Sequence, residues 1–295
     1  MRVAMTSVMV SAAMLASVTG QAPAPTAADG KVRLIIQGDD MGVGHGVNVA
    51  TIEAHTRGVL KSANVIITGS WVPEAARLLN AHPEIDAGVH LALTSEWENV
   101  KWRPLTTAPS LVDAHGYFFP TVVPRPGAPA GTSMREARLD LGEVERELRA
   151  QIVLAKALIP HLTYTWEHMG FGSVSPDVRA IVRRLTKEHG LVTPGPDNGV
   201  SFLRRVWDNT DSGAVRARKL AAALQALTPG TWLMVEHAAT DTPEMRAFGH
   251  AGYEHVAIDR QAVLDAWTSA EVRAAIDARG IELTSLREAL KNIPR

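Results

Sequence analysis

Short apolar runs and longer amphipathic runs alternate along this chain from residue 31 onward. The runs 31–37, 63–69 and 86–93 are rich in Val, Ile, Leu and Ala, a pattern that indicates strands buried in a sheet. The segments 46–58 and 72–82 instead carry apolar residues three or four positions apart, as amphipathic helices do. Repeated strand–helix units predict an α/β fold with a parallel sheet covered by helices, either doubly wound or closed into a barrel.

The same alternation resumes in the second half of the chain. A long amphipathic helix is predicted over 142–159, strands over 162–168 and 231–237, and a helix over 175–190 with a serine cap, a proline at its first position and a glycine at its end. The tail 259–290 predicts helix, helix, short strand and helix. These elements extend one α/β domain over residues 31–295.

Two segments do not follow the alternation. Residues 96–138 are irregular and rich in proline, and such a long insertion in a compact domain is a candidate to cover a substrate. Residues 1–22 resemble a signal peptide, and 23–30 read as a flexible linker. The protein is therefore expected to be exported, to the periplasm or the medium; a disordered N-terminal tail is the alternative.

Composition excludes several classes of partner. The formal net charge of −1 argues against nucleic acid or an anionic membrane surface as the main partner, because both require a basic excess. The chain has no cysteine, which excludes disulfides and a cysteine-linked lipid anchor. The apolar run near the N-terminus is too short for a stable membrane-spanning helix, so no membrane span is expected after signal removal.

Acidic and histidine side chains stand at the predicted carboxyl ends of four strands. Asp39 and Asp40 end the first strand, His90 lies in the third, and His168 and His237 end two later ones. Because the carboxyl ends of parallel strands meet at one edge, these side chains are expected to share one cleft. One aspartate with two histidines is typical of a divalent-metal site that leaves positions open for water.

Each of these residues also has an ordinary structural interpretation. Either aspartate alone would cap the helix that follows, and a single histidine at a strand end is more often structural than a metal ligand. One cap leaves the second aspartate unexplained, because only a cation or a shared proton relieves the repulsion between two adjacent carboxylates. The role of His45, close to the pair in the first loop, stays open.

The motifs around these residues are similar to those of the YdjC-like carbohydrate deacetylases, relatives of the chitooligosaccharide deacetylases. LIIQGDDMGVGHGVN resembles the opening strand of that family, with Asn48 as its downstream asparagine, and GVHLALT resembles the family's Gly-Leu-His-Leu-Asn-Leu-Thr strand. PGTWLMVEHAA resembles the late strand that presents a histidine, and the closing helix–strand–helix is also similar. The matches run in the expected order over nearly all of residues 31–290.

The resemblance implies a fold, a metal site and a reaction. It implies a distorted (β/α) barrel of the TIM-like, polysaccharide-deacetylase-like type and removal of acetyl groups from N-acetylated sugars. Asp40, His90 and His168 would be the metal ligands, Asp39 the general base, and His237 the acid that protonates the leaving amine. A metal would polarise the acetyl carbonyl and lower the pKa of its water, from which Asp39 takes a proton.

The donor set and the departures from the family pattern leave several points open. One divalent ion is expected; Zn²⁺ is favoured, Fe²⁺, Co²⁺ and Mn²⁺ also suit two imidazoles and a carboxylate, and Mg²⁺ suits them less. Trp166 and Gly170 stand where the family has an aspartate and a second histidine, and Ala238–Ala239 replace Pro-Gly. Glu167 is a candidate to support His168. The sugar, its linkage and the oligomeric state, a homodimer included, stay open.

Other functions fit the same residues. One is hydrolysis of a different amide or ester on the same barrel, and another is non-catalytic carbohydrate binding by a retained fold. A sugar-phosphate isomerase is disfavoured, because the chain has no Gly-rich phosphate loop with a lysine. Trp71, Trp97, Trp102 and Trp166 are candidates to stack on a sugar ring, although packing is the commoner role of tryptophan.

Overall fold

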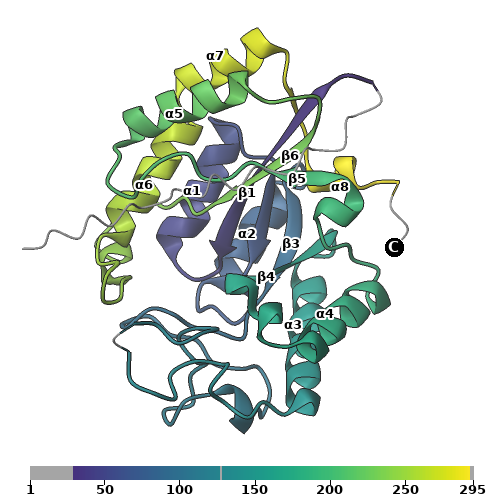
Figure 1. The fold of residues 1–295 in the computed structure, drawn as a ribbon, viewed down its shortest axis with the longest axis vertical. Coiled ribbons are helices and arrows are strands. Elements are labelled where there is room, and N and C mark those ends of the chain that lie inside the picture. The colour runs from purple at the N-terminus through teal and green to yellow at the C-terminus, as the bar shows by residue number, and fades with distance from the viewer. Residues whose placement is uncertain (1–28, 127, 293–295) are drawn as a thin grey trace, which may run out of the picture.

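One curled parallel sheet organises the molecule (Figure 1). The computed structural model describes residues 29–126 and 128–292. The strands follow the spatial order β4-β3-β2-β1-β6-β5, with β7 paired to β1, and every pair is parallel. Within the described ranges no pairing joins β4 to β5, so the sheet is an open half barrel. The predicted α/β fold is confirmed.

The strands are short apart from the central one. Their bounds are β1 (Val32–Met41), β2 (Ser62–Val65), β3 (Asp86–Leu91), β4 (Tyr164–Glu167), β5 (Val200–Phe202), β6 (Gly230–Glu236) and β7 (Glu282–Leu283). The sequence pattern did not predict β5, whose three residues are too few for a periodic signal. β1 also runs on through the two aspartates, where the pattern placed its end.

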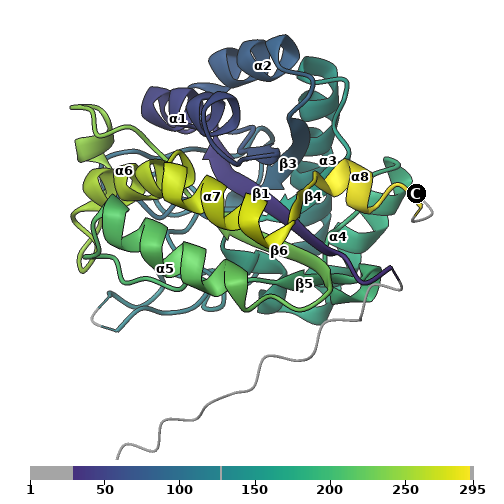
Figure 2. The same ribbon diagram turned by 90° about the horizontal axis from the view of Figure 1, so that it is seen from above.

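Helices cover the outside of the curl (Figure 2). They are α1 (His45–Thr56), α2 (Val72–Ala81), α3 (Leu141–Leu158), α4 (Pro176–Glu188), α5 (Gly213–Gln225), α6 (Val256–Trp267), α7 (Ala270–Arg279) and α8 (Leu286–Ala289). α5 packs on α6 and α7, α3 packs on α4, and α1 packs on α2. Among the helices described, none has the length and apolar character needed to cross a membrane.

The apolar run of β1 explains its central position. Leu34, Ile35 and Ile36 are completely buried. Successive side chains of a strand point to opposite faces, so Leu34 and Ile36 join the main hydrophobic core while Ile35 joins a smaller cluster that includes Tyr164 and Leu233. A strand covered on both faces needs apolar residues at every position, which is why this segment does not alternate.

The local signals predicted for the start of α4 are present in the structure. Ser175 Oγ accepts a hydrogen bond from the Val178 amide at 3.2 Å, and Pro176 is the first residue of α4. Asp140 caps α3 in the same way, because its side chain accepts from the Gly142 and Glu143 amides. These caps satisfy amides that have no partner inside the helix.

The described residues of the irregular segment 96–138 lie at the end of the sheet toward which the arrow of β1 points (Figure 1). Its described residues include one short 3₁₀ helix, Pro109–Leu111, and isolated bridges such as Val112 to Phe118. The segment is therefore placed beside the strand ends, where the candidate site residues gather. The predicted signal peptide and most of the predicted linker lie outside the described residues.

Candidate metal and catalytic site

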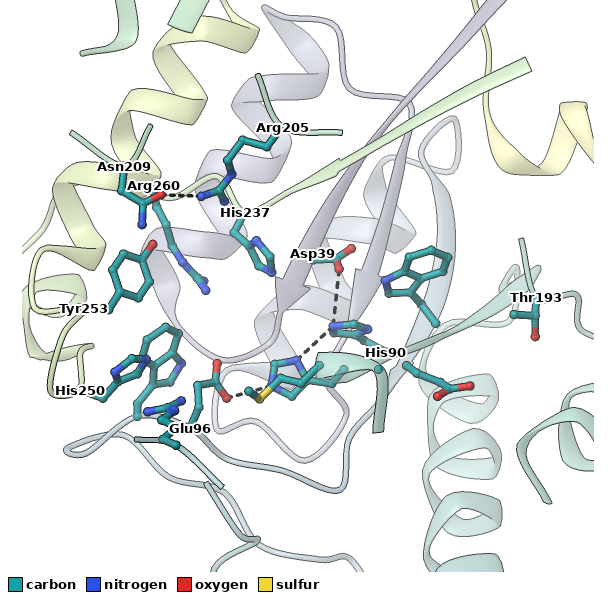
Figure 3. Close-up of a pocket in the computed structure, with 17 residues that line it drawn as sticks. Asp39, His90, Glu96, Thr193, Arg205, Asn209, His237, His250, Tyr253 and Arg260 are labelled. Carbon is teal, nitrogen blue, oxygen red and sulfur yellow. Dashed lines mark hydrogen bonds and ion pairs between the residues drawn. The ribbon is translucent and has the colours of Figure 1, made fainter. Parts of the chain in front are cut away.

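The structure brings together the five residues singled out at strand ends. Asp39 and Asp40 lie near the end of β1, His90 lies in β3, and His168 and His237 directly follow β4 and β6. β6, β1, β2, β3 and β4 are consecutive in the sheet, so their carboxyl ends meet at one edge. Figure 3 shows Asp39, His90 and His237 around one cavity.

Asp40, His90 and His168 offer three ligand atoms that all lie within 4.8 Å of one another. Asp40 Oδ1 is 3.4 Å from His90 Nε2 and 3.5 Å from His168 Nδ1, and these two nitrogens are 3.3 Å apart. All three residues are buried, and Asp40 Oδ1 has no hydrogen-bond partner within the described ranges. This buried, unsatisfied oxygen facing two imidazole nitrogens fits a divalent cation.

A local irregularity of β1 explains how two adjacent aspartates reach the same site. Neighbouring side chains of a regular strand point to opposite faces, but the pairing of β1 with β2 shifts register between Gly38 and Met41. Asp40 has a φ of 71°, in the left-handed region that aspartate adopts more readily than most residues. A bulge of this kind re-aims side chains next to active sites, and here both carboxylates approach His90 Nε2, Asp40 at 3.4 Å and Asp39 at 3.7 Å.

Glu96 is a site residue that the sequence interpretation missed. Its Oε2 lies 2.8 Å from His168 Nε2, and the residue is 7% exposed. An acceptor at Nε2 leaves His168 Nδ1 free to face Asp40 and His90, which is how outer carboxylates orient metal-binding histidines. The sequence signal for this role is weak: Glu96 lies six residues after His90, at the start of the irregular segment.

Glu167, the residue suggested for that supporting role, makes a different contact. Its carboxylate accepts a hydrogen bond of 2.6 Å from the Gly172 amide and closes the turn that follows His168. A Cβ at Gly172 would lie 2.3 Å from that same carboxylate, so a larger residue there would displace the carboxylate from this hydrogen bond. Glu167 therefore shapes the backbone after His168, while the ring of His168 is bonded to Glu96.

Asp39 is held by one of its two oxygens. Oδ1 accepts hydrogen bonds from Gln37 Nε2 at 2.8 Å and from Asn64 Nδ2 at 2.7 Å. Oδ2 accepts no hydrogen bond from the residues described, lies 3.7 Å from His90 Nε2, and belongs to a residue that lines the cavity. The carboxylate is thus fixed on one side and available on the other.

His237 lies beside Asp40, His90 and His168, which we call the metal-fitting group. Its Nε2 is 3.7 Å from Asp40 Oδ2, and about a third of its side chain (34%) is exposed. On the other side of the ring, Nδ1 is 4.0 Å from the carboxylate of Glu236, which accepts two hydrogen bonds from Arg205. The ring therefore lies between two carboxylates at the cavity wall.

Arg260 of α6 is a second site residue that the sequence interpretation missed. Its Nη2 donates a hydrogen bond of 2.9 Å to Asp40 Oδ2, and the residue is 4% exposed. Asp40 thus binds Arg260 with one oxygen and faces His90 and His168 with the other. The sequence alone does not show whether an arginine of an amphipathic helix is buried in a site or exposed on the surface.

The electrostatics of the site favour positive charge around Asp40. Burial alone would raise the pKa of Asp40, but the charges of His237 and Arg260 outweigh it and hold that pKa well below the usual range. Burial alone would lower the pKa of His168, but Glu96 and Asp40 raise it to about 10. For His237, too, Asp40 and Glu236 overcome burial and raise the pKa.

The cavity that these residues border has a volume of about 600 Å³, which suits a ligand of small-molecule size. Its wall combines charged groups with aromatic rings, among them Trp97, Trp166 and Tyr253. Trp166 packs against Phe202, with ring centroids 6.1 Å apart. Of the other tryptophans considered for sugar stacking, Trp102 is buried against His168, and Trp71 is partly exposed and does not line this cavity.

A family model described as YdjC-like protein matches residues 33–278. The chain belongs to the YdjC-like family. Among curated relatives of this YdjC-like protein, a carbohydrate deacetylase of Thermus thermophilus is 32% identical over 238 residues, covering 74% of this chain and 81% of the relative. A chitooligosaccharide deacetylase of Yersinia pestis is 28% identical over 267 residues, covering 85% of this chain and 97% of the relative.

Solved structures share the fold of this YdjC-like protein. A proposed cellobiose-phosphate cleavage protein of Enterococcus faecalis aligns with a TM-score of 0.71 at 22% identity, over 88% of this chain and 99% of that one. A peptidoglycan N-acetylglucosamine deacetylase aligns with a TM-score of 0.51 at 9% identity, over 92% of both chains. At these identities the likeness establishes the polysaccharide-deacetylase-like fold alone.

Two other residues of the YdjC-like motifs have structural roles in the described ranges. Asn48 accepts a hydrogen bond of 2.8 Å from the Gly42 amide and donates to Glu74 at 3.0 Å, which fixes the turn after β1. His45 Nδ1 also contacts Glu74, at 3.0 Å. His45 therefore belongs to the support of the first loop and does not join the metal-fitting group.

Proposed function

We propose that this chain is a metal-dependent carbohydrate deacetylase that hydrolyses the acetamide group of an N-acetylated sugar. The observation that carries the proposal is the meeting of Asp40, His90 and His168 beside Asp39 and His237 at one cavity. The names of the Thermus and Yersinia relatives support it, since both are deacetylases of carbohydrates.

Asp40, His90 and His168 are the residues that hold the cation. A divalent cation bound there supplies Lewis acidity toward a carbonyl oxygen and lowers the pKa of water. We favour Zn²⁺, because two imidazoles and one carboxylate suit it well. Glu96 keeps His168 in the orientation that presents Nδ1 to the cation.

Asp39 acts as the general base. Gln37 and Asn64 hold Oδ1, so Oδ2 is left to take a proton from the attacking water. The water oxygen then forms a bond to the acetyl carbon. A carboxylate fixed by two amide donors stays in place during this step, and such preorganisation is what makes a general base effective.

His237 acts as the general acid. The carboxylates of Asp40 and Glu236 raise the pKa of the ring and so favour its protonated form, and the exposed part of the ring reaches the cavity. The ring donates its proton to the sugar nitrogen as the carbon–nitrogen bond breaks, because an amine anion is a very poor leaving group. The products are acetate and the free amino sugar.

We also propose that the protein acts after export, as the predicted signal peptide over residues 1–22 indicates. Cell-wall or environmental N-acetylated sugars are then the substrates to examine first.

Acetate release tests the proposed reaction. Purified protein loaded with Zn²⁺ is incubated with a panel of N-acetylated oligosaccharides, and free acetate and free amine are measured together. Equal amounts of both from at least one sugar, with none from the same protein after chelation, is the expected result. Sugar binding without acetate release across the panel would identify a non-catalytic binding protein instead.

A further inference from the structure

Arg260 has a free edge that the site described so far does not use. Its Nη2 donates to Asp40 Oδ2, while Nε and Nη1 are buried and have no hydrogen-bond partner within the described ranges. Buried polar groups nearly always have a partner, and a guanidinium carries five N–H donors in a fixed plane. The two unpartnered nitrogens are therefore candidates to meet a ligand.

Arg260 itself belongs to the cavity wall. Arg260 lines the same cavity as Asp39, His90 and His237, and its guanidinium lies between Tyr253 and His237 (Figure 3). A ligand atom that reaches this edge is therefore close to the candidate acid and to Asp40, and so to the atoms that the proposed reaction changes.

The guanidinium is held rigidly in this position. Its carbon lies 5.1 Å from the ring centroid of Trp97, a cation–π contact that covers one face. Trp97 is itself stacked on His250, with centroids 5.7 Å apart and an interplanar angle of 17°. Trp97 on one face and Asp40 at one nitrogen thus fix the plane of Arg260 before any ligand enters.

Asp259, the residue that precedes Arg260 in the chain, is already engaged. Tyr253 donates its hydroxyl proton to Asp259, and Asp259 also pairs with the fully buried Arg216. Asp259 is therefore not a missing partner of Arg260. Glu96, whose charge also acts on Arg260, is bonded through Oε2 to His168, which leaves a ligand in the cavity as the partner we consider for the free edge.

We propose that the free edge of Arg260 binds a small carboxylate, and holds the acyl oxygen of the substrate before it holds the acetate product. This inference rests on the proposed function, because acetate is a product only of deacetylation. A planar guanidinium matches the two oxygens of a carboxylate. The same donors meet the acyl oxygen as it gains negative charge, where fixed donors contribute most to catalysis.

Arg260→Lys separates this role from simple charge compensation of Asp40. Lysine keeps a positive charge within reach of Asp40 but lacks the planar set of spare N–H groups. Arg216→Lys is the matched control, since Arg216 is equally buried but does not line the cavity. Circular dichroism and metal analysis establish that each variant is folded and loaded.

The experiment is an NMR titration of acetate against Zn²⁺-loaded wild type and both variants. Loss of a charged hydrogen-bonded pair is expected to weaken acetate binding by about 10- to 100-fold in Arg260→Lys at equal metal content, and Arg216→Lys is expected to bind as the wild type does. Equal acetate affinity in Arg260→Lys and wild type would overturn the inference.

A second measurement keeps the inference testable if Arg260→Lys does not fold. A crystal structure of the wild type with Zn²⁺ and acetate is expected to place an acetate oxygen within hydrogen-bond distance of Arg260 Nε or Nη1; acetate bound elsewhere would contradict the inference. Failure of the proposed function would give a result distinct from failure of this inference. Arg260-dependent acetate binding without acetate release from any sugar would support the carboxylate site and reject the deacetylase activity.

Discussion

Glu96 Oε2 lies 2.8 Å from His168 Nε2, and both residues are buried. This contact ties the irregular segment 96–138 to the strand ends, because Glu96 belongs to the segment and His168 directly follows β4. It also determines which nitrogen of His168 faces Asp40. A residue outside the sheet thereby sets the geometry of the metal-fitting group.

Glu96→Ala is expected to weaken metal binding by about 10- to 100-fold, as removal of such outer carboxylates does. The physical reason is that His168 Nε2 loses its acceptor, so the ring is free to rotate. Glu98→Ala is the matched control, because Glu98 is exposed and accepts only from the Ala251 amide among the described residues. Competition with a chelating indicator measures both affinities; an unchanged affinity in Glu96→Ala would refute the orienting role.

Gly88→Ala is expected to destabilise the protein by about 1–3 kcal/mol, the usual cost of overpacking a core. A Cβ at Gly88 would lie 2.3 Å from the ring of Tyr164, which is fully buried beside it. Gly195→Ala is the control: its backbone is extended and its Cβ would meet no atom within 4 Å. Urea unfolding compares the two, and equal stabilities would show that the β3–β4 contact is more adaptable than described.

Glu145→Gln is expected to lower stability at neutral pH, with a loss that disappears in acid. Arg184 and then Arg149 lower the pKa of Glu145 from 4.5 to about 2. A group with a lowered folded-state pKa stabilises above its unfolded value of 4.5, and the contribution is lost as pH falls toward about 2. Because the groups are at the surface, the effect is small and is further reduced by salt.

Denaturation of wild type and Glu145→Gln at several pH values measures this effect. The same substitution in a chain that already carries Arg149→Gln and Arg184→Gln is the control and should show no such pH dependence. A stability difference that stays constant between neutral pH and pH values near 2 would exclude the proposed ion pair between α3 and α4.

The strand-end residues were predictable because their signals are local. A run such as 31–37 reveals a buried strand through its composition, and the direction of a parallel strand follows from the helices that separate it from its neighbours. Asp39, Asp40 and His90 could therefore be assigned to one edge without knowledge of the sheet order. Their catalytic and metal-binding roles remain predictions.

Glu96 and Arg260 were not predictable, because nothing local marks them. Glu96 lies in an irregular segment whose path depends on its packing against the rest of the chain. Arg260 lies between Asp259 and Gln261 in a helix, where a charged residue is usually exposed. Only the packing of α6 beside α1 and the end of β1 turns this arginine toward Asp40.

Asp39→Asn is expected to lower kcat for acetate release by about 10²- to 10⁴-fold, the usual contribution of a general base. An amide keeps the shape of the side chain but cannot take a proton from water. Asp197→Asn, on the exposed surface, is the control and should retain full turnover. Wild-type turnover in Asp39→Asn would reject the general-base role while leaving the metal site intact.

The central claim is that the two adjacent aspartates have different roles: Asp40 binds the metal, and Asp39 takes a proton from the attacking water. The most direct test is the metal content of purified Asp40→Ala and Asp39→Asn, prepared under identical conditions with excess Zn²⁺ removed by dialysis. The account predicts that Asp40→Ala loses its metal and that Asp39→Asn keeps the wild-type content. Full metal in Asp40→Ala, or loss of metal in Asp39→Asn, would contradict it.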